Sequence, residues 1–238
     1  MTQQGLYGKF AKYYDKIYDF KDYKMEAEAV STLIKKHKLS TGNTLLDLGC
    51  GTAKHLQYLT EYECTGVDLS EELLEIAKAN VPGAQFICAD MRSFHTGEKY
   101  DIIISLFSSI GYLTAIEDLR KMILKSFMHL KTGGVFIFEP WISPELFSAR
   151  TTLNTIEEEG NKIVRLISSS RKDNASVLDI HWLIAEVDQQ ILHFSEKHEM
   201  GLFSKETISE VLESENFKVT YRDDLLGRGL FIAQKIVV

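Results

Sequence analysis

Two glycines stand directly after a short apolar run, in a pattern that lets a ligand approach the backbone. Leu45–Leu48 has the character of a buried strand, and Gly49 and Gly51 follow it. Without Cβ atoms, these glycines leave room for a ligand at the turn, with Asp47 just inside the pocket. A dinucleotide-binding turn needs a third glycine, but Lys54 stands there. A pyrophosphate cradle, and with it a nicotinamide enzyme, is therefore disfavoured.

Acidic residues close the next two predicted strands. Asp68 ends the second strand and is followed by Leu69, and Asp90 and Met91 end the third. The first carboxylate can accept hydrogen bonds from ribose hydroxyls, and the second from an adenine amino group. Each aspartate alone could equally cap the following helix or turn. The ordered set after Gly49 predicts a site for S-adenosylmethionine, which carries an adenosine but no phosphate.

The residues after the fourth predicted strand are candidates for contact with a methyl acceptor. Methyl transfer from a sulfonium is an in-line displacement with a neutral leaving group, so the protein mainly holds the acceptor atom against the methyl carbon in a dry pocket. Phe107, Ser108 and Tyr112 lie at this strand end, which faces the cofactor in a doubly wound sheet. Tyr112 is a candidate to contact the acceptor, the alternative being simple packing.

Cationic and aromatic residues further along suggest a phosphorylated acceptor. Arg228 is flanked by Gly227 and Gly229, so its guanidinium can reach a diphosphate without obstruction. Arg171 precedes a turn and could add a phosphate contact or be a solvated charge. Trp141 could stack on a base or sugar, or fill an interface.

The histidines do not form a metal-ligand pattern. His181 lies on one predicted strand and His193 and His198 on the next, and no cysteine or carboxylate falls at ligand spacing. No metal site is expected, and we assign these histidines to the core or the substrate pocket, with His181 as the substrate-binding candidate.

Up to about Pro140 the chain alternates apolar strands with amphipathic helices, which predicts a mostly parallel sheet covered on both faces. The predicted strands are Leu45–Leu48, Cys64–Asp68, Phe86–Ala89, Tyr100–Leu106 and Gly134–Glu139. The predicted helices are Asp22–His37, Lys54–Thr60, the helix capped by Ser70 that runs to Asn80, and Ile116–Leu130.

After Trp141 the pattern changes to short strands separated by turns. An antiparallel β insert is predicted over 141–203, contributing to the acceptor site, with strands at Lys162–Ser170, Ser176–Val187 and Gln190–Met200. A helix over Ser204–Glu215 and a C-terminal hairpin of Lys218–Arg222 with Gly229–Ile236 follow. The expected fold is α/β, a Rossmann-like seven-stranded sheet, in a single domain over 1–238.

Composition limits the class of protein. The chain has 238 residues, a net charge of −7 and 45% hydrophobic residues, as expected for one globular domain that binds a small molecule and neither nucleic acid nor membrane. Its three cysteines are odd in number and lie in or beside apolar runs, so a disulfide framework is not expected. With no signal-peptide pattern at the N-terminus, we expect a cytoplasmic protein.

Over most of its length the sequence resembles the class I methyltransferases, and within them the N,N-dimethyltransferases that act on the amine of nucleotide-linked (dTDP) deoxyamino sugars. The more specific matches are Glu139-Pro-Trp141 with Pro144-Glu145, His193-Phe-Ser195 and Gly227-Arg-Gly-Leu-Phe231. The generic matches are Lys21-Asp-Tyr23, Leu45–Thr52, Gly66–Ser70, Asp90–Phe94, Phe107–Leu113 and Gly133-Gly134. Ala53 departs from the pattern, since many methyltransferases have glycine there.

The resemblance implies cofactor contacts from Tyr14, Tyr23, Gly49, Asp68, Asp90 and Met91. Similar proteins hold tyrosine or histidine at the position of Tyr112, so the resemblance implies that Tyr112 positions the acceptor or accepts its proton. Tyr14 is a second catalytic candidate. It also implies a diphosphate contact by Arg228 and suggests a homodimer. Three alternatives stay open: a methyltransferase for a small free amine, a cofactor-binding protein without catalysis, and a dehydrogenase.

Overall fold

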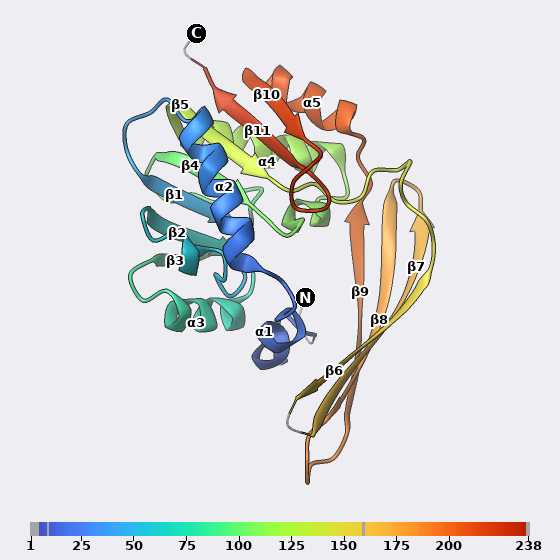
Figure 1. The fold of residues 1–238 in the computed structure, drawn as a ribbon. Helices are drawn as coiled ribbons and strands as arrows, with labels where there is room; N and C mark the ends of the chain where they lie inside the picture. The colour runs from blue at the N-terminus through green and yellow to red at the C-terminus, as the bar shows by residue number, and fades with distance from the viewer. Residues whose placement is uncertain (1–4, 9, 159, 237–238) are drawn as a thin grey trace.

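The computed structural model of the chain describes residues 5–8, 10–158 and 160–236. Its main element is a seven-stranded sheet with the order β10-β11-β5-β4-β1-β2-β3, and a separate four-stranded sheet has the order β6-β7-β8-β9 (Figure 1). In the large sheet β3, β2, β1, β4 and β5 run parallel, and β11 is antiparallel to both of its neighbours. The predicted α/β fold with an antiparallel insert and a C-terminal hairpin is confirmed.

The strands of the large sheet are β1 (Thr44–Leu48), β2 (Glu63–Asp68), β3 (Gln85–Cys88), β4 (Tyr100–Ser105), β5 (Leu130–Phe138), β10 (Phe217–Arg222) and β11 (Leu230–Lys235). The second sheet contains β6 (Thr151–Glu158), β7 (Asn161–Lys172), β8 (Ala175–Ala185) and β9 (Leu192–Gly201). The helices are α1 (Tyr14–Ile17), α2 (Tyr23–His37), α3 (Glu71–Asn80), α4 (Ile116–His129) and α5 (Lys205–Ser214). Short 3₁₀ turns span η1 (Ala11–Tyr13), η2 (Leu56–Tyr58) and η3 (Ser109–Tyr112).

Helices cover both faces of the large sheet, which explains why its central strands are apolar throughout. Successive side chains of a strand point to opposite faces. On one face Ile102 and Ile104 pack with Val30 of α2, and on the other Ile103 packs with Met122 of α4. The carboxyl ends of β1, β2 and β4 are therefore held rigidly at one edge, where the candidate site lies.

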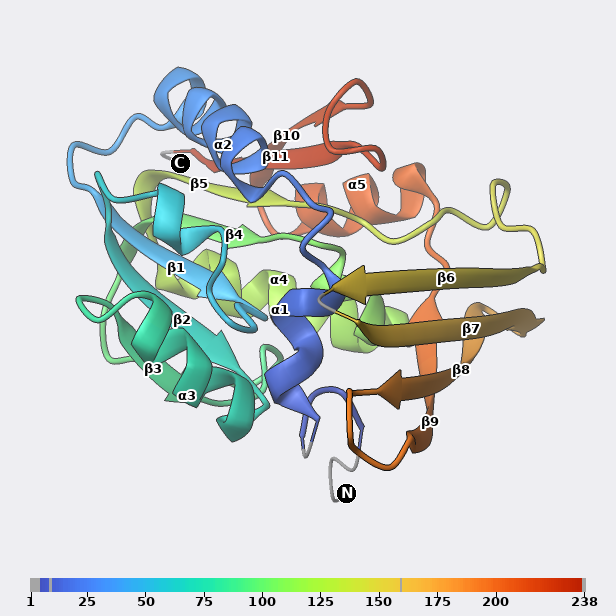
Figure 2. The same cartoon turned by 60° about the horizontal axis from the view of Figure 1, so that its bottom comes forward.

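The four-stranded sheet lies beside these carboxyl ends, with α1 between the two sheets (Figure 2). Its inner face carries a small core of its own, in which Trp182 is completely buried and packs with Ile163 and Phe194. The insert is anchored there to the N-terminal segment, since Phe10 stacks on Phe194 with ring centroids 3.9 Å apart. One wall of the space between the sheets is thus the inner face of the insert.

The predicted elements and the structure differ at one helix and at one strand. The predicted helix over Lys54–Thr60 is wrong, because only the short 3₁₀ turn η2 forms there. Ala53 has a φ of 61°, so the left-handed turn continues past Gly51 and delays the helical turn. Strand β6 was not predicted, because its exposed and largely polar residues give little apolar periodicity.

Helix capping follows the sequence closely. Ser70 caps α3 by accepting a hydrogen bond from the amide of Leu73 at 3.0 Å, as predicted. Ser204 caps α5 in the same way through the amide of Thr207, so this helix begins one residue later than predicted. None of the helices in the described part of the chain has the length and apolar character needed to cross a membrane.

Candidate active site

The glycine turn after β1 is fixed by hydrogen bonds from its own backbone. Gly49 and Gly51 have φ angles of 75° and 54°, which favour glycine. The amide of Gly49 donates to the carbonyl of Val67 at 2.7 Å, and the amide of Gly51 donates to Asp68 Oδ2 at 2.8 Å. A Cβ at Gly49 would lie 2.6 Å from the Cβ of Ser109, so this position excludes a larger residue.

Asp68 connects the glycine turn to the next helix. Its second oxygen, Oδ1, accepts from the amide of Ser70 at 2.9 Å. Burial raises the pKa of this carboxyl, and the backbone amides of Ser70 and Gly51 counteract that effect. Asp68 and Leu69 both line the large cleft described next, with Met91 nearby in the lining.

A cleft of about 790 Å³ lies between the two sheets, large enough for a cofactor and an acceptor together. The glycine turn forms one side, and residues from the ends of β4 and β5 form another. The inner face of the insert contributes alternate residues, among them Thr152 and Asn154 from β6 and Ile180 from β8.

Aromatic residues of the N-terminal segment close the cleft beside the turn. Tyr14 lines it, and its hydroxyl would lie 3.9 Å from a Cβ placed on Gly51. Tyr23 lines a small adjoining pocket under the same turn together with Asp47. Burial raises the pKa of Asp47 to about 8.

The backbone at the end of β4 is strained. Phe107 and Ser108 have φ angles of 54° and 56°, a conformation that costs on the order of 1–3 kcal/mol for such residues. The hydroxyl of Ser108 donates to the carbonyl of Pro140 at 2.7 Å, which joins the ends of β4 and β5. The strained turn places the Ser108 hydroxyl in the polar region where Arg228 and Glu139 meet.

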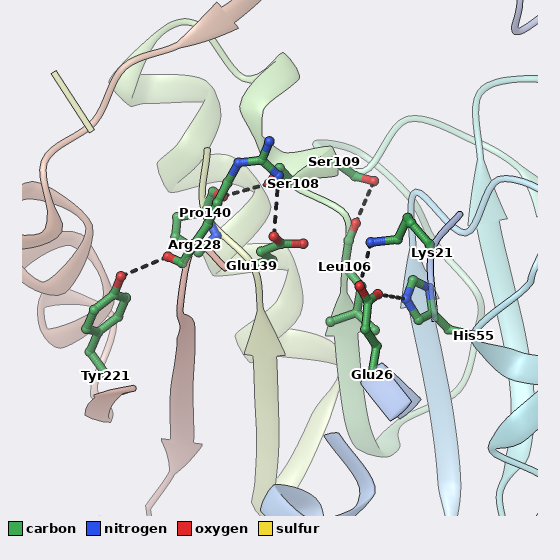
Figure 3. Close-up of polar contacts among 10 residues, drawn as sticks. All are labelled: Lys21, Glu26, His55, Leu106, Ser108, Ser109, Glu139, Pro140, Tyr221 and Arg228. Atoms are coloured by element: carbon green, nitrogen blue, oxygen red, sulfur yellow. Dashed lines mark hydrogen bonds and ion pairs between the residues drawn. The ribbon is translucent and has the colours of Figure 1, made fainter. Parts of the chain in front are cut away.

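Arg228 reaches into this polar region from the loop between β10 and β11 (Figure 3). Its Nη1 donates to Ser108 Oγ at 3.2 Å and lies 3.4 Å from Glu139 Oε1. The guanidinium carbon lies 4.6 Å from the ring centroid of Trp141. The other oxygen of Glu139, Oε2, is buried without a hydrogen-bond partner among the described residues.

Burial raises the pKa of Glu139 to about 7, although Arg228 and Lys21 act in the opposite direction. Lys21 lines the cleft from the segment just before α2, and its Nζ lies 2.6 Å from Glu26 Oε1. Glu26 Oε2 in turn lies 2.8 Å from Nε2 of the buried His55 (Figure 3). The ion pair of Lys21 and Glu26, with side chains 10% and 12% exposed, is therefore largely shielded from solvent.

Tyr112, on η3, also lines the cleft and lies in a hydrogen-bonded group of aromatic residues. Its hydroxyl is 2.7 Å from that of Tyr7 and 2.6 Å from His198 Nδ1. The structure thus brings Tyr112 to the same cleft as Tyr14, Trp141 and Arg228.

Tyr23 and Asp47 line only the adjoining pocket, and Asp90, Arg171 and His181 line neither this pocket nor the cleft. Both oxygens of Asp90 bind the guanidinium of Arg92, and this pair, with backbone support, lowers the pKa of Asp90. Arg171 lies at the exposed end of β7 and donates to the carbonyls of Asp173 and Pro144. His181 points to the outer face of β8, where its ring stacks on His193 with centroids 5.4 Å apart.

Comparison with known proteins identifies the family. Residues 45–134 match a family model described as a methyltransferase domain. The chain is 32% identical to a dTDP-3-amino-3,4,6-trideoxy-alpha-D-glucopyranose N,N-dimethyltransferase of Streptomyces venezuelae, over 89% of this chain and 91% of the relative. The chain belongs to the S-adenosylmethionine-dependent methyltransferases. A dTDP-3-amino-3,6-dideoxy-alpha-D-glucopyranose N,N-dimethyltransferase of Streptomyces fradiae is 33% identical over 94% of this methyltransferase and 90% of its own length.

Solved structures agree over nearly the whole chain. The crystal structure of DesVI from Streptomyces venezuelae has a TM-score of 0.88 with 32% identity and covers 94% of this methyltransferase and 98% of DesVI. CalS10, an amino pentose methyltransferase from Micromonospora echinaspora solved with bound S-adenosylmethionine, has a TM-score of 0.84 with 28% identity, covering 93% of this chain and 96% of CalS10.

The glycine turn of the methyltransferase fits an adenosyl cofactor and not a dinucleotide. Gly51 faces the cleft with open space around its Cα, as close approach of a ligand requires. Lys54, which replaces the third glycine, turns away to Asp15, with Nζ 3.2 Å from Oδ2. No cation from the turn is therefore directed at a pyrophosphate.

Several cleft residues were not predicted as site residues, and His198 was assigned only to the core or the substrate pocket. The residues not predicted are Tyr7, Lys21, Glu139, Arg150, Arg165 and Glu196. A signal for Glu196 was present, because alternation along the predicted strand Gln190–Met200 puts it on one face with His198. Tyr7 had none, since it reaches the cleft only through tertiary contacts. Within the described ranges, no three His, Cys, Asp or Glu side chains gather as a metal-ligand set.

Proposed function

We propose that this methyltransferase methylates the amino group of a dTDP-linked deoxyamino sugar. The relatives with these acceptors match about nine-tenths of the chain. The observation that carries the proposal for this chain is Arg228, a cation held over Trp141 at the cleft. An arginine in this setting suits a diphosphate, which it can bind through two parallel hydrogen bonds.

The charge of the cleft supports an anionic acceptor. Lys21, Arg150, Arg165 and Arg228 all line it, although the whole chain has a net charge of −7. Three carboxylates also line it: Asp68 is bound by backbone amides, Glu139 lies beside Arg228 and Glu196 lies beside His198. A local excess of cations in an acidic protein draws a negatively charged ligand to this cleft.

For the cofactor we propose contacts from Gly49, Gly51 and Leu69, with Asp68 on the ribose and Asp90 with Met91 at the adenine. Asp47, Tyr14, Tyr23 and Phe107 would enclose the methionine end. S-adenosylmethionine supplies an electrophilic methyl carbon on a sulfonium that leaves as a neutral thioether. The cleft residues exclude water, orient the acceptor and keep its nitrogen unprotonated.

For the acceptor we propose Arg228 on the diphosphate, Trp141 against the nucleotide or sugar, and Tyr112 near the amine, with Tyr14 as a further catalytic candidate. The insert over 141–203 would form the outer wall of the acceptor site within one domain. Arg171 and His181 would contribute only from the rim or indirectly, given their distance from the cleft lining.

Steady-state kinetics of an Arg228→Ala variant tests the acceptor. Loss of a charge-assisted contact of about 1.5–3 kcal/mol predicts a rise of about 10- to 100-fold in KM for a dTDP-aminosugar. The matched control is Arg171→Ala, which removes an arginine outside the cleft and should leave KM within about threefold. An unchanged KM in Arg228→Ala would favour the second candidate, methylation of a small free amine.

We also propose that the protein is a cytoplasmic homodimer that pairs through the outer face of the insert. Leu153, Leu166 and Leu183 are 65%, 48% and 44% exposed on this face. Register places Leu153 opposite Leu166, and Val164 opposite Leu183, in one apolar band. A Leu166→Glu variant should convert a dimer to a monomer in light scattering, and a monomeric wild type would contradict the proposal.

The three cysteines are free thiols, as suits a reducing compartment.

A further inference from the structure

We propose that His198, oriented by Glu196, receives the proton that the acceptor amine loses, through the hydroxyl of Tyr112. The inference rests on the proposed methylation of an amine. It adds a proton path to a site in which the positioning of the amine is otherwise the main contribution.

The path is a continuous set of close contacts that starts in the cleft. The Tyr112 hydroxyl lies 2.6 Å from His198 Nδ1, and His198 Nε2 lies 3.3 Å from Glu196 Oε1. Tyr112, His198 and Glu196 all line the cleft. They come from η3 and β9, so the path crosses from the large sheet to the insert.

Glu196 is held firmly enough to orient the histidine. Its Oε2 accepts from the amide of Leu6 at 2.9 Å, and its Oε1 accepts from Trp182 Nε1 at 3.0 Å. Burial alone would raise the pKa of Glu196, but His198 and these donors hold it below its ordinary value. The carboxylate is therefore ionised at neutral pH.

An ionised Glu196 fixes which nitrogen of His198 is protonated. The neutral imidazole directs Nε2–H to Glu196 and leaves Nδ1 as the acceptor for the Tyr112 hydroxyl. The same carboxylate stabilises the imidazolium when Nδ1 gains a proton, as in other carboxylate–histidine pairs.

Tyr112 suits the role of a relay. Desolvation within the cleft, where 43% of the Tyr112 surface is exposed, raises the pKa of its hydroxyl above the ordinary value, so the group stays protonated and passes a proton without holding a negative charge. Tyr7, 2.7 Å away, can donate to the same oxygen and leave a lone pair for the amine. The other titratable groups facing this path are Tyr14 and Tyr18 from the N-terminal helix, with Arg165 of β7 beside Tyr18.

The proton count closes at each step. The ammonium N–H proton moves to the Tyr112 oxygen as the Tyr112 proton moves to His198 Nδ1, which leaves a neutral amine, a neutral tyrosine and an imidazolium. The amine lone pair then forms the bond to the methyl carbon as the carbon–sulfur bond breaks, giving a methylated ammonium and a thioether. His198 returns its proton to solvent, and a second methylation requires the same deprotonation again.

The test is the pH dependence of kcat with a dTDP-aminosugar for His198→Asn. Asparagine can still accept a hydrogen bond from the Tyr112 hydroxyl, so it should replace His198 if the histidine only holds Tyr112 in place. It cannot take up a proton. We expect kcat to fall about 10- to 100-fold at pH 7, with the deficit shrinking toward pH 9 as the amine loses its proton in solution. Monomethylated product should accumulate, since the second transfer needs a second deprotonation.

The matched control is His193→Asn, on the same strand but facing away from the cleft, which should keep wild-type kcat at every pH. Binding of S-adenosylhomocysteine, measured by calorimetry, should be unchanged in both variants. Wild-type kcat in His198→Asn across pH 6–9, or a loss of equal size at every pH, overturns the relay. If the wild type instead methylates no aminosugar at all, the proposed function fails, and this outcome is distinct from a failed relay.

Discussion

The guanidinium of Arg228 lies over the indole of Trp141, with 4.6 Å between the guanidinium carbon and the ring centroid. Trp141 also donates from Nε1 to Ser176 Oγ at 2.9 Å, which ties the end of β5 to the insert. One indole thus joins the parallel sheet, the C-terminal hairpin and the insert at the cleft, and it fixes the direction from which the arginine meets a ligand.

Replacing Trp141 with alanine should weaken acceptor binding without affecting the cofactor. Loss of a cation–π contact of about 0.5–2 kcal/mol predicts a KM for the sugar nucleotide raised roughly 2- to 30-fold. Trp141→Phe keeps an aromatic face for Arg228, so its KM should lie between those of the wild type and Trp141→Ala. Initial rates at saturating S-adenosylmethionine measure this, and equal KM values in all three proteins would exclude the role.

Acceptor affinity should depend on pH through Glu139. A diphosphate bound at Arg228 disfavours the nearby carboxylate, so binding raises the pKa of Glu139 above about 7 and is coupled to proton uptake. Affinity should therefore fall as pH rises from 6 to 8, by about three- to tenfold for a further rise of half to one pKa unit. Calorimetry with dTDP-glucose, which carries no amine, isolates this effect.

Glu139→Gln is the control for that measurement, because glutamine keeps the shape of the side chain and does not titrate. Its affinity for dTDP-glucose should be nearly constant over the same range. A wild-type affinity that does not vary with pH would show that Arg228 and Glu139 do not meet the diphosphate.

Asp68 and Asp90 should differ in their importance for the cofactor. Asp68→Ala leaves the amides of Gly51 and Ser70 without their acceptor, so we expect S-adenosylhomocysteine to bind about 10- to 100-fold more weakly. Asp90 is held by Arg92 outside the cleft lining, and Asp90→Ala should cost less than about tenfold. Dissociation constants for S-adenosylhomocysteine, measured by calorimetry, test this difference. A larger loss of affinity in Asp90→Ala than in Asp68→Ala would contradict it.

Asp47 should make the fold less stable as pH rises. Its folded pKa is about 8, against about 3.9 in an unfolded chain, so the folded state binds more protons between these values. The contribution is fully present below pH 4 and is lost as pH rises toward 8. The free energy of unfolding in urea should therefore rise for Asp47→Asn relative to the wild type between pH 5 and pH 8. A difference that stays constant over this range would mean that Asp47 is ionised throughout.

The sequence predicted those parts of the site that depend on local pattern and on the topology of a parallel sheet. Gly49, Asp68 and Met91 follow successive strands, and the carboxyl ends of neighbouring parallel strands meet at one edge. The cap at Ser70 is equally local, because it needs only the residues of one turn.

Contacts between distant segments could not be predicted in this way. Leu6 and Glu196 are 190 residues apart, and their hydrogen bond exists only because the N-terminal segment packs against the insert. The same holds for Tyr7 and Tyr112, which are 105 residues apart. His181 was predicted at the substrate site from its residue type, whereas the register of β8 turns it to the outer face.

The most direct test of the account is to incubate the wild-type protein with S-adenosylmethionine and a series of dTDP-linked 3-amino and 4-amino deoxysugars, and to follow the products by mass spectrometry. We predict that at least one sugar nucleotide gains one or two methyl groups, with one S-adenosylhomocysteine formed for each methyl. Methylation of free amines alone, with every sugar nucleotide left unmodified, would contradict it.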